Sequence, residues 1–228
     1  MTDHRELTML LCLFLSYLVA SAWESLAHWQ ILHAGKHARQ RWRDWGGFGD
    51  LLRLAFFYHN RVHHRRTFVS NYWVQFDSPL QRQRLDQRLK GEIRKRLMSN
   101  GYGTTITGFW ELFTFAAFPM LLNSVLCALL APRWVLLGIM IGLLPLLMTK
   151  YIHPLLHVDV NELSAGANGP RQSLIQSGSF RFLQQYHFLH HKYGLVNFNL
   201  LPGADLLLFV YRYDRRHFIS FDGRYHPG

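Results

Sequence analysis

The chain has few cysteines and few acidic residues. Its 228 residues include only two cysteines, Cys12 and Cys127, and no CxxC pair occurs. This pattern argues against a disulfide framework and against a cysteine-bound zinc site, so we interpret both thiols as small buried side chains. Asp and Glu number 14 against 25 Lys and Arg, which leaves a formal net charge of +11. Such a charge favours an anionic partner, either nucleic acid or an anionic membrane surface.

Three long apolar segments favour the membrane and argue against nucleic acid. They cover residues 7–28, 106–130 and 133–152, and only the short sequence APR joins the last two. A helix needs roughly 20 mainly apolar residues to cross a bilayer. We therefore predict three transmembrane helices, of which the last two form a tight hairpin.

The first apolar segment has an alternative interpretation as a cleaved signal peptide, because the sequence ASA at 20–22 resembles a cleavage site. The residues before it, MTDHRE, carry no net positive charge, whereas signal peptides begin with basic residues. Lys36 and Arg39 follow it closely, and basic residues near helix ends stay in the cytoplasm. We therefore predict an uncleaved anchor.

The basic residues also give the three predicted helices one orientation. With the amino terminus outside, only Arg5 and Arg133 among the 25 Lys and Arg lie outside. The prediction is an all-α integral membrane protein that forms a single domain over residues 1–228, with a cytoplasmic helical cap made by residues 34–105 and 153–228. Because the chain is compact and carries no retention signal, we expect a bacterial inner membrane.

Residues 80–98 are predicted to form an amphipathic helix. Apolar residues recur on one face and Arg and Lys occupy the others; the apolar face comprises Leu80, Leu85, Leu89, Ile93 and Leu97. Such a helix can lie flat on an anionic leaflet. The alternative is a helix that packs on the protein's own cap, and the sequence leaves both open.

Ten of the fourteen histidines form four short clusters with the sequences HWQILH, HNRVHH, HPLLH and HFLHH. These clusters comprise His28, His33, His59, His63, His64, His153, His157, His187, His190 and His191. In the three-span arrangement all four clusters lie near the membrane on the cytoplasmic side. Clusters far apart in the sequence can therefore converge on one site.

The spacing of the histidines predicts how they group. Residues three or four apart share one face of an α-helix, so His59 is expected to meet His63, and His153 to meet His157. His187 is expected to pair with both later histidines of its cluster. The adjacent histidine of each HH pair points about 100° further round the helix, toward a second point. This geometry suits two neighbouring metal ions.

His28 and His33 are five residues apart, which requires a helix end or a distortion near residue 30. Ten imidazoles exceed one four-ligand zinc site and suit two ions with about five ligands each. Neutral nitrogen ligands with one open position suit an iron ion that meets dioxygen. Zinc also binds imidazole, and a purified sample can carry it as a substitute.

The order HxxxxH, HxxxHH, HxxxH and HxxHH resembles the fatty acid hydroxylase and sterol desaturase superfamily of integral-membrane di-iron enzymes. The tail HHKYGLVNFNLLPGADLLLF also resembles the ending of that family, and the resemblance covers residues 23–209. It implies that the ten clustered histidines bind two iron ions, that dioxygen is a co-substrate, and that a C–H bond of a lipid-like substrate is oxidised. It also implies an electron donor such as a ferredoxin, a rubredoxin or cytochrome b5. The chain departs from many members by having three predicted spans rather than four.

Side chains that accept the second imidazole N–H would orient the metal ligands. The candidates are Glu24, Asp159, Asn161 and Asn197. Each of them could instead cap a helix or hold a loop. We expect the substrate to enter from the membrane between the second and third spans. The aromatic side chains expected along that path are Phe109, Trp110, Phe113 and Phe115.

Three functions compete. The leading prediction is hydroxylation of an unactivated C–H bond in a lipid or fatty-acyl chain, and a desaturase with the same metal unit is the alternative within enzymes. A non-enzymatic protein for metal binding or transport is the third. Transport predicts polar residues inside the spans, and the second and third spans offer only Asn123 and Ser124 near their middle.

Overall fold

The computed structural model describes residues 3–105, 108–215 and 221–224, without the side chains of 3–5 and 109–114. Within these residues every regular element is a helix, and the only β-type pairing is an isolated bridge between Asn71 and Arg224. The prediction of an all-α fold is confirmed.

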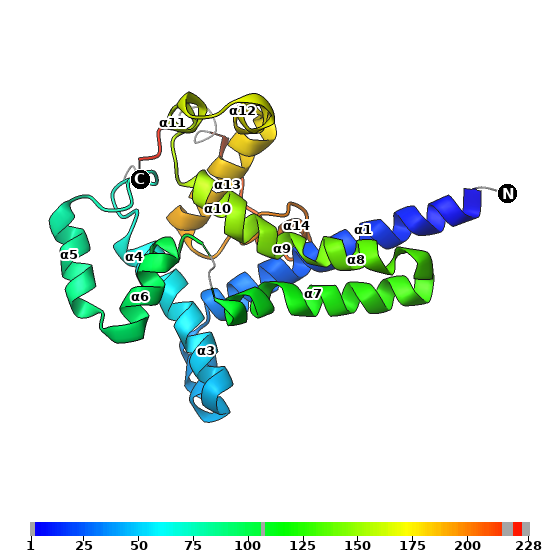
Figure 1. Cartoon of the computed structure of the whole chain (residues 1–228), viewed down its shortest axis with the longest axis horizontal. Coiled ribbons are helices and arrows are strands. Elements are labelled where there is room, and N and C mark those ends of the chain that lie inside the picture. The colour runs from blue at the N-terminus through cyan, green and yellow to red at the C-terminus, as the bar shows by residue number, and fades with distance from the viewer. Residues whose placement is uncertain (1–2, 106–107, 216–220, 225–228) are drawn as a thin grey trace.

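Three long helical segments run side by side and form one end of the molecule (Figure 1). They are α1 (Asp3–Ala27), α7 (Phe109–Leu130) and a third segment that begins with α8 (Val135–Gly142). This third segment continues through α9 (Leu144–Leu147) and a π-helix, η6 (Met148–Ile152). The tight hairpin is confirmed, because one 3₁₀ turn, η5 (Pro132–Trp134), links α7 to α8.

Close contacts join the three segments. The Asn123 amide on α7 donates to the carbonyl oxygens of Ser16 on α1, at 3.1 Å, and Gly138 on α8, at 3.2 Å. The Sγ atoms of Cys12 and Cys127 lie 2.9 Å apart, and both thiols are free and buried. The interpretation of the two cysteines as small buried side chains is confirmed.

Two helical stretches are long and apolar enough to cross a membrane, Glu6–Leu32 and Pro132–Leu156. The apolar stretch of α7 whose side chains are described, Phe115–Leu130, is shorter. Large apolar side chains on the outer faces of these segments are exposed, including Leu129 and Leu136. The structure therefore contains two candidate spans, and three spans remain a prediction.

The other helices build a cap at one end of the long segments (Figure 1). They are α2 (Lys36–Arg41), α3 (Gly46–Phe56), α4 (His64–Arg66), α5 (Pro79–Arg88), α6 (Gly91–Ser99), α10 (His153–Leu156), α11 (Val160–Ala165), α12 (Gly169–Gln176), α13 (Gly178–Tyr193) and α14 (Ala204–Leu207).

The predicted amphipathic helix over 80–98 is two helices, α5 and α6, separated at Leu89 and Lys90. Its buried leucines, Leu85, Leu89 and Leu97, pack in one cluster with Tyr58, Val62 and Tyr102 of the cap. Of the two alternatives, the structure shows the helix that packs on the protein's own cap.

Candidate metal centre

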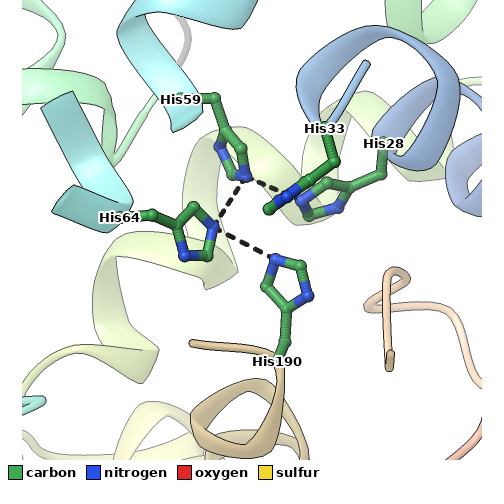
Figure 2. Close-up of side chains that lie close together, drawn as sticks. All are labelled: His28, His33, His59, His64 and His190. Carbon is green, nitrogen blue, oxygen red and sulfur yellow. Dashed lines mark hydrogen bonds between the residues drawn. The ribbon is translucent and has the colours of Figure 1, made fainter. Parts of the chain in front are cut away.

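The ten clustered histidines come together in two neighbouring groups of five. The first group consists of His28, His33, His59, His64 and His190, which point toward one another from η1 (His28–Leu32) and the residue after it, η3 (Phe57–His63), α4 and α13 (Figure 2). The second group consists of His63, His153, His157, His187 and His191. In each group the ligand nitrogens all lie within 4.8 Å of one another. This arrangement agrees with the predicted two sites of about five ligands each.

Two π-helical turns set the grouping. His28 opens η1 (His28–Leu32), and the His33 amide donates to the His28 carbonyl at 3.0 Å. A π-helix bonds residues five apart, so it brings such residues onto one face. The predicted distortion near residue 30 is therefore present. His59 and His64 are also five apart and share the first group, because η3 (Phe57–His63) is a π-helix as well.

Two of the predicted histidine pairings are wrong. His63 belongs to the second group and His59 to the first, so the expectation that they share one point is wrong. In α13, which is a regular α-helix, His187 shares the second group with His191, four residues on. His190 points to the first group, so its predicted pairing with His187 is also wrong. The pairing of His153 with His157 is confirmed.

Nitrogen atoms in the first group face one another at close range. The Nε2–Nε2 distances are 2.8 Å for His28 and His59, 3.0 Å for His59 and His64, and 3.1 Å for His64 and His190 (Figure 2). A neutral imidazole carries one N–H and one lone pair. His190 Nδ1 lies 2.8 Å from the Val196 carbonyl oxygen, to which it donates its proton. Its Nε2 lone pair is therefore free to bind a metal ion.

Backbone carbonyls orient the second group in the same way. His153 Nδ1 donates to the Thr104 carbonyl at 2.5 Å, and His157 Nδ1 donates to the Tyr72 carbonyl at 3.2 Å. The lone pair of His153 Nε2 then faces His187 Nε2 at 2.8 Å. Backbone acceptors of this kind fix the tautomer that leaves Nε2 available to a metal.

These separations fit metal ligation. Two ligands at right angles on a six-coordinate ion, with metal–nitrogen bonds of about 2.1 Å, lie about 3.0 Å from each other. Several buried ring nitrogens have no hydrogen-bond partner within the described residues, among them His33 Nε2, His157 Nε2, His191 Nε2 and both nitrogens of His63. Buried polar atoms are normally satisfied, and a cation in each group would satisfy them.

Electrostatics keep the ligands in the form that binds metals. Burial lowers the pKa of His190 to about 4. Burial, together with neighbouring imidazoles, holds the pKa of His59, His63 and His64 well below the usual histidine range. The rings are therefore neutral at pH 7. Among the described residues no carboxylate or thiol joins either group, so each is a set of neutral nitrogen donors.

Three of the four candidate orienting residues, Glu24, Asp159 and Asn197, hydrogen bond elsewhere, and Asn161 takes part through its backbone amide. Glu24 Oε2 accepts from the Leu201 amide at 3.0 Å, and Asp159 Oδ1 accepts from the Asn161 amide at 2.7 Å, where α11 begins. The Asn197 amide donates to the Arg212 carbonyl at 2.9 Å and holds a loop. In the described part of the chain, the alternative roles in caps and loops are the ones observed.

Asn60 was missed by the sequence analysis, although it directly follows His59 in the second cluster. Its side-chain Nδ2 lies 3.2 Å from His33 Nδ1, so the amide N–H donates to the Nδ1 lone pair. If the amide oxygen and nitrogen are exchanged, which leaves the shape of the side chain unchanged, the oxygen accepts the Nδ1 proton and leaves His33 Nε2 free for a metal. The signal available in the sequence was the position of Asn60 inside the cluster HNRVHH.

Aromatic rings cover both groups. Phe198 packs against His28, His33 and His190, with ring centroids 5.5–5.7 Å apart. Phe68 stacks on His157 at a centroid distance of 4.2 Å. These apolar rings restrict the access of water to the imidazoles.

An inner cavity of ≈ 70 Å³ borders both groups. Its histidines are His28 and His59 from the first group and His153 and His187 from the second. The remaining wall includes Glu24 and the apolar side chains of Leu32, Ala55, Phe115 and Leu200. Of the aromatic residues predicted along the substrate path, Phe115 lies in this wall. The side chains of Phe109, Trp110 and Phe113 lie outside the described residues.

No protein-family model, curated protein or solved structure matches the chain.

Proposed function

We propose that this chain is an integral-membrane di-iron oxygenase that hydroxylates an unactivated C–H bond of a lipid or fatty-acyl substrate. The observation that carries the proposal is the pair of neighbouring groups of five neutral imidazoles. The motif order, which resembles the fatty acid hydroxylase and sterol desaturase superfamily, supports the same chemistry.

Iron suits this donor set better than a structural zinc ion. A structural zinc closes its shell with four ligands, whereas each group here offers five, and imidazole binds iron as well as zinc. Five protein ligands leave one position open on an octahedral ion. Zinc bound in a purified sample would be a substitute.

The protein's own residues hold the ions and shape the site. The ten histidines would bind two iron ions, which when bound supply dioxygen activation and the oxidation of the C–H bond. Backbone carbonyls fix the ring orientations, and Phe198 and Phe68 restrict water. The inner cavity touches histidines of both groups, so a carbon placed there lies beside both metal sites.

Hydroxylation by dioxygen also consumes electrons, which a carrier protein must supply. A second cavity has a surface suited to binding such a carrier. It reaches His64 and His191 and is lined by four permanently cationic residues, Arg39, Arg61, Arg65 and Lys192. No acidic residue lines it in the described part of the chain. Such a surface attracts an acidic carrier of the ferredoxin, rubredoxin or cytochrome b5 type.

The membrane location belongs to the proposal. Two candidate spans and their exposed apolar faces support an integral membrane protein. The distribution of Lys and Arg favours a centre on the cytoplasmic side, and we propose a bacterial inner membrane.

Transport of metal is the weaker alternative, because the two polar residues near the middle of the predicted second and third spans bond to helix backbones. Asn123 donates to carbonyls of both neighbouring segments, and the Ser124 hydroxyl donates to the Met120 carbonyl on its own helix. They therefore do not line a path for ions.

Two measurements test the proposal. After anaerobic reconstitution with iron, metal analysis should find about two iron ions per chain. Lipid mass spectrometry of cells with and without the expressed chain should find products that gain one oxygen atom. Products that lose two hydrogens would indicate a desaturase. Fewer than one iron ion per chain, or an unchanged lipid profile, would contradict the proposed activity.

A further inference from the structure

Leu200 separates the inner cavity from an apolar groove on the surface. The groove is lined by Met148, Phe182, Leu183, Leu201 and Pro202 together with Leu200, and by the small residues Gly178 and Ser179. Leu200 is the one described residue that lines both spaces. Its side chain is only 5% exposed and packs in a cluster with Met148 and Leu183.

The inner cavity and the groove differ in size, so they suit different parts of a ligand. The inner cavity of ≈ 70 Å³ is far below the volume of about 300–1,000 Å³ that ligand sites usually have. The groove, at ≈ 450 Å³, lies within that range. The inner cavity is partly open rather than sealed, and a ligand longer than a few carbon atoms cannot lie wholly inside it, whereas the groove has room for the rest.

The backbone on both sides of Leu200 is fixed to α1. The Asn199 side-chain amide donates to Ser21 Oγ at 2.8 Å, and the Leu201 amide donates to Glu24 Oε2 at 3.0 Å. The Ser21 hydroxyl donates to the Leu201 carbonyl at 2.6 Å. Because these contacts hold the backbone, opening the wall requires a rotation of the Leu200 side chain alone.

The groove borders the candidate spans. Met148 belongs to the stretch Pro132–Leu156, and the Pro202 carbonyl accepts the Tyr17 hydroxyl of α1 at 2.7 Å. The segment that follows, α14 and the two residues after it, exposes Leu206, Leu207 and Phe209, the last of them 94% exposed. These side chains extend an apolar surface beside the groove, as expected of a surface that contacts lipid.

The geometry points to Leu200 as a gate between the groove and the inner cavity, through which one unbranched hydrocarbon chain reaches the histidines. The occupant is a single linear acyl or alkyl chain. A fused sterol ring does not fit the inner cavity without displacing the fixed backbone. The inference rests on the proposed function only for the reaction at the hydrocarbon chain. The binding of the hydrocarbon chain does not depend on the proposed function.

The test uses a fatty acid with a diazirine at the end of its chain and the full protein in lipid nanodiscs without added iron. Light should attach the probe to inner-cavity residues such as Leu32 and Ala55. In Leu200→Trp, inner labelling should fall about tenfold, because the larger side chain fills the passage. The label should then move to groove residues such as Met148. Leu174→Trp, the same change at an exposed position outside both spaces, should label as the wild type does.

Further measurements make the outcome decisive. If Leu200→Trp fails to fold, as shown by loss of its thermal unfolding transition, Leu200→Ala decides, and inner labelling must rise above the wild type. Equal inner labelling in wild type and folded Leu200→Trp would overturn the gate. A sterol diazirine that labels the inner cavity would overturn the restriction to linear chains. Inner labelling, together with no oxidised product from a separate sample reconstituted with iron and supplied with a reductant and dioxygen, would contradict the proposed function and leave the gate intact.

Discussion

His59 and His64 are five residues apart, and their Nε2 atoms lie 3.0 Å from each other. The intervening π-helix places them on one face, whereas His63 turns toward the other group. Two neighbouring residues, His63 and His64, therefore belong to different histidine groups, each of which could hold a metal ion.

This division predicts separable losses of metal. We expect His63→Ala and His64→Ala each to weaken the binding of one ion by about 10- to 100-fold, as loss of a ligand or of its support does in other metal sites. Metal analysis after a short dialysis should find about one iron ion per chain in each variant, and close to none in the double variant. His37→Ala, outside both groups, is the control. Two ions retained by the double variant would contradict the two sites.

The buried imidazoles predict that the metal-free chain is less stable in acid. Burial lowers the pKa of His190 to about 4, below its usual value near 6.5. Between these values the unfolded chain binds more protons than the folded chain, so stability falls as the pH is lowered from 6.5 toward 4. Each such group costs about 1.4 kcal/mol per pH unit in this window. The melting temperature of the metal-free protein in detergent should therefore fall between pH 7 and pH 5, and a constant or rising value would contradict this.

At Gly138 the backbone of α8 lies in close contact with α7. A Cβ atom at Gly138 would lie 2.5 Å from Cys127 Sγ and 3.1 Å from the Asn123 carbonyl oxygen. Gly138→Ala should therefore destabilise the protein by about 1–3 kcal/mol, measured by thermal unfolding. Gly166→Ala is the matched control, because a Cβ there meets nothing within 4 Å and its φ is −104°. Equal effects of the two substitutions would contradict the packing.

The two cysteines offer a test of how α1 lies against α7. Their Sγ atoms are 2.9 Å apart, although the residues are far apart in the sequence. A membrane-permeable oxidant such as copper phenanthroline should link them within one chain, with the loss of two hydrogens by mass spectrometry. Cys12→Ser should abolish the link. Links between chains only, or none at all, would be inconsistent with the observed contact.

The sequence predicted the all-helical fold, the hairpin and which ten histidines come together. These predictions succeeded because the length of apolar segments and the short spacing of histidines are local properties. The sequence mispaired His59 with His63 because an α-helical period was assumed where the chain forms π-helical turns. The extra residue in each turn is stabilised by contacts with distant segments, which local periodicity does not contain.

The groups that orient the imidazoles also could not be predicted from local sequence patterns. Backbone carbonyls of Thr104, Tyr72 and Val196 hold the imidazoles, and a carbonyl belongs to every residue type. The role of Leu200 was hidden for a similar reason, since a leucine in an apolar tail does not reveal that it divides two spaces.

The π-helical turns let the chain hold one extra residue inside two of its histidine motifs. A π-helix closes its hydrogen bond between residues five apart, so each turn takes up one residue more than an α-helix and still keeps its two histidines on one face. Deleting one residue between His28 and His33, or between His59 and His64, would leave the two histidines four apart, a spacing that also shares one face of an α-helix. The same deletion within α13, a regular α-helix, would rotate the histidines beyond it by about 100°. Single-residue deletions should therefore be tolerated better in the two π-helical turns than in the histidine motif of α13.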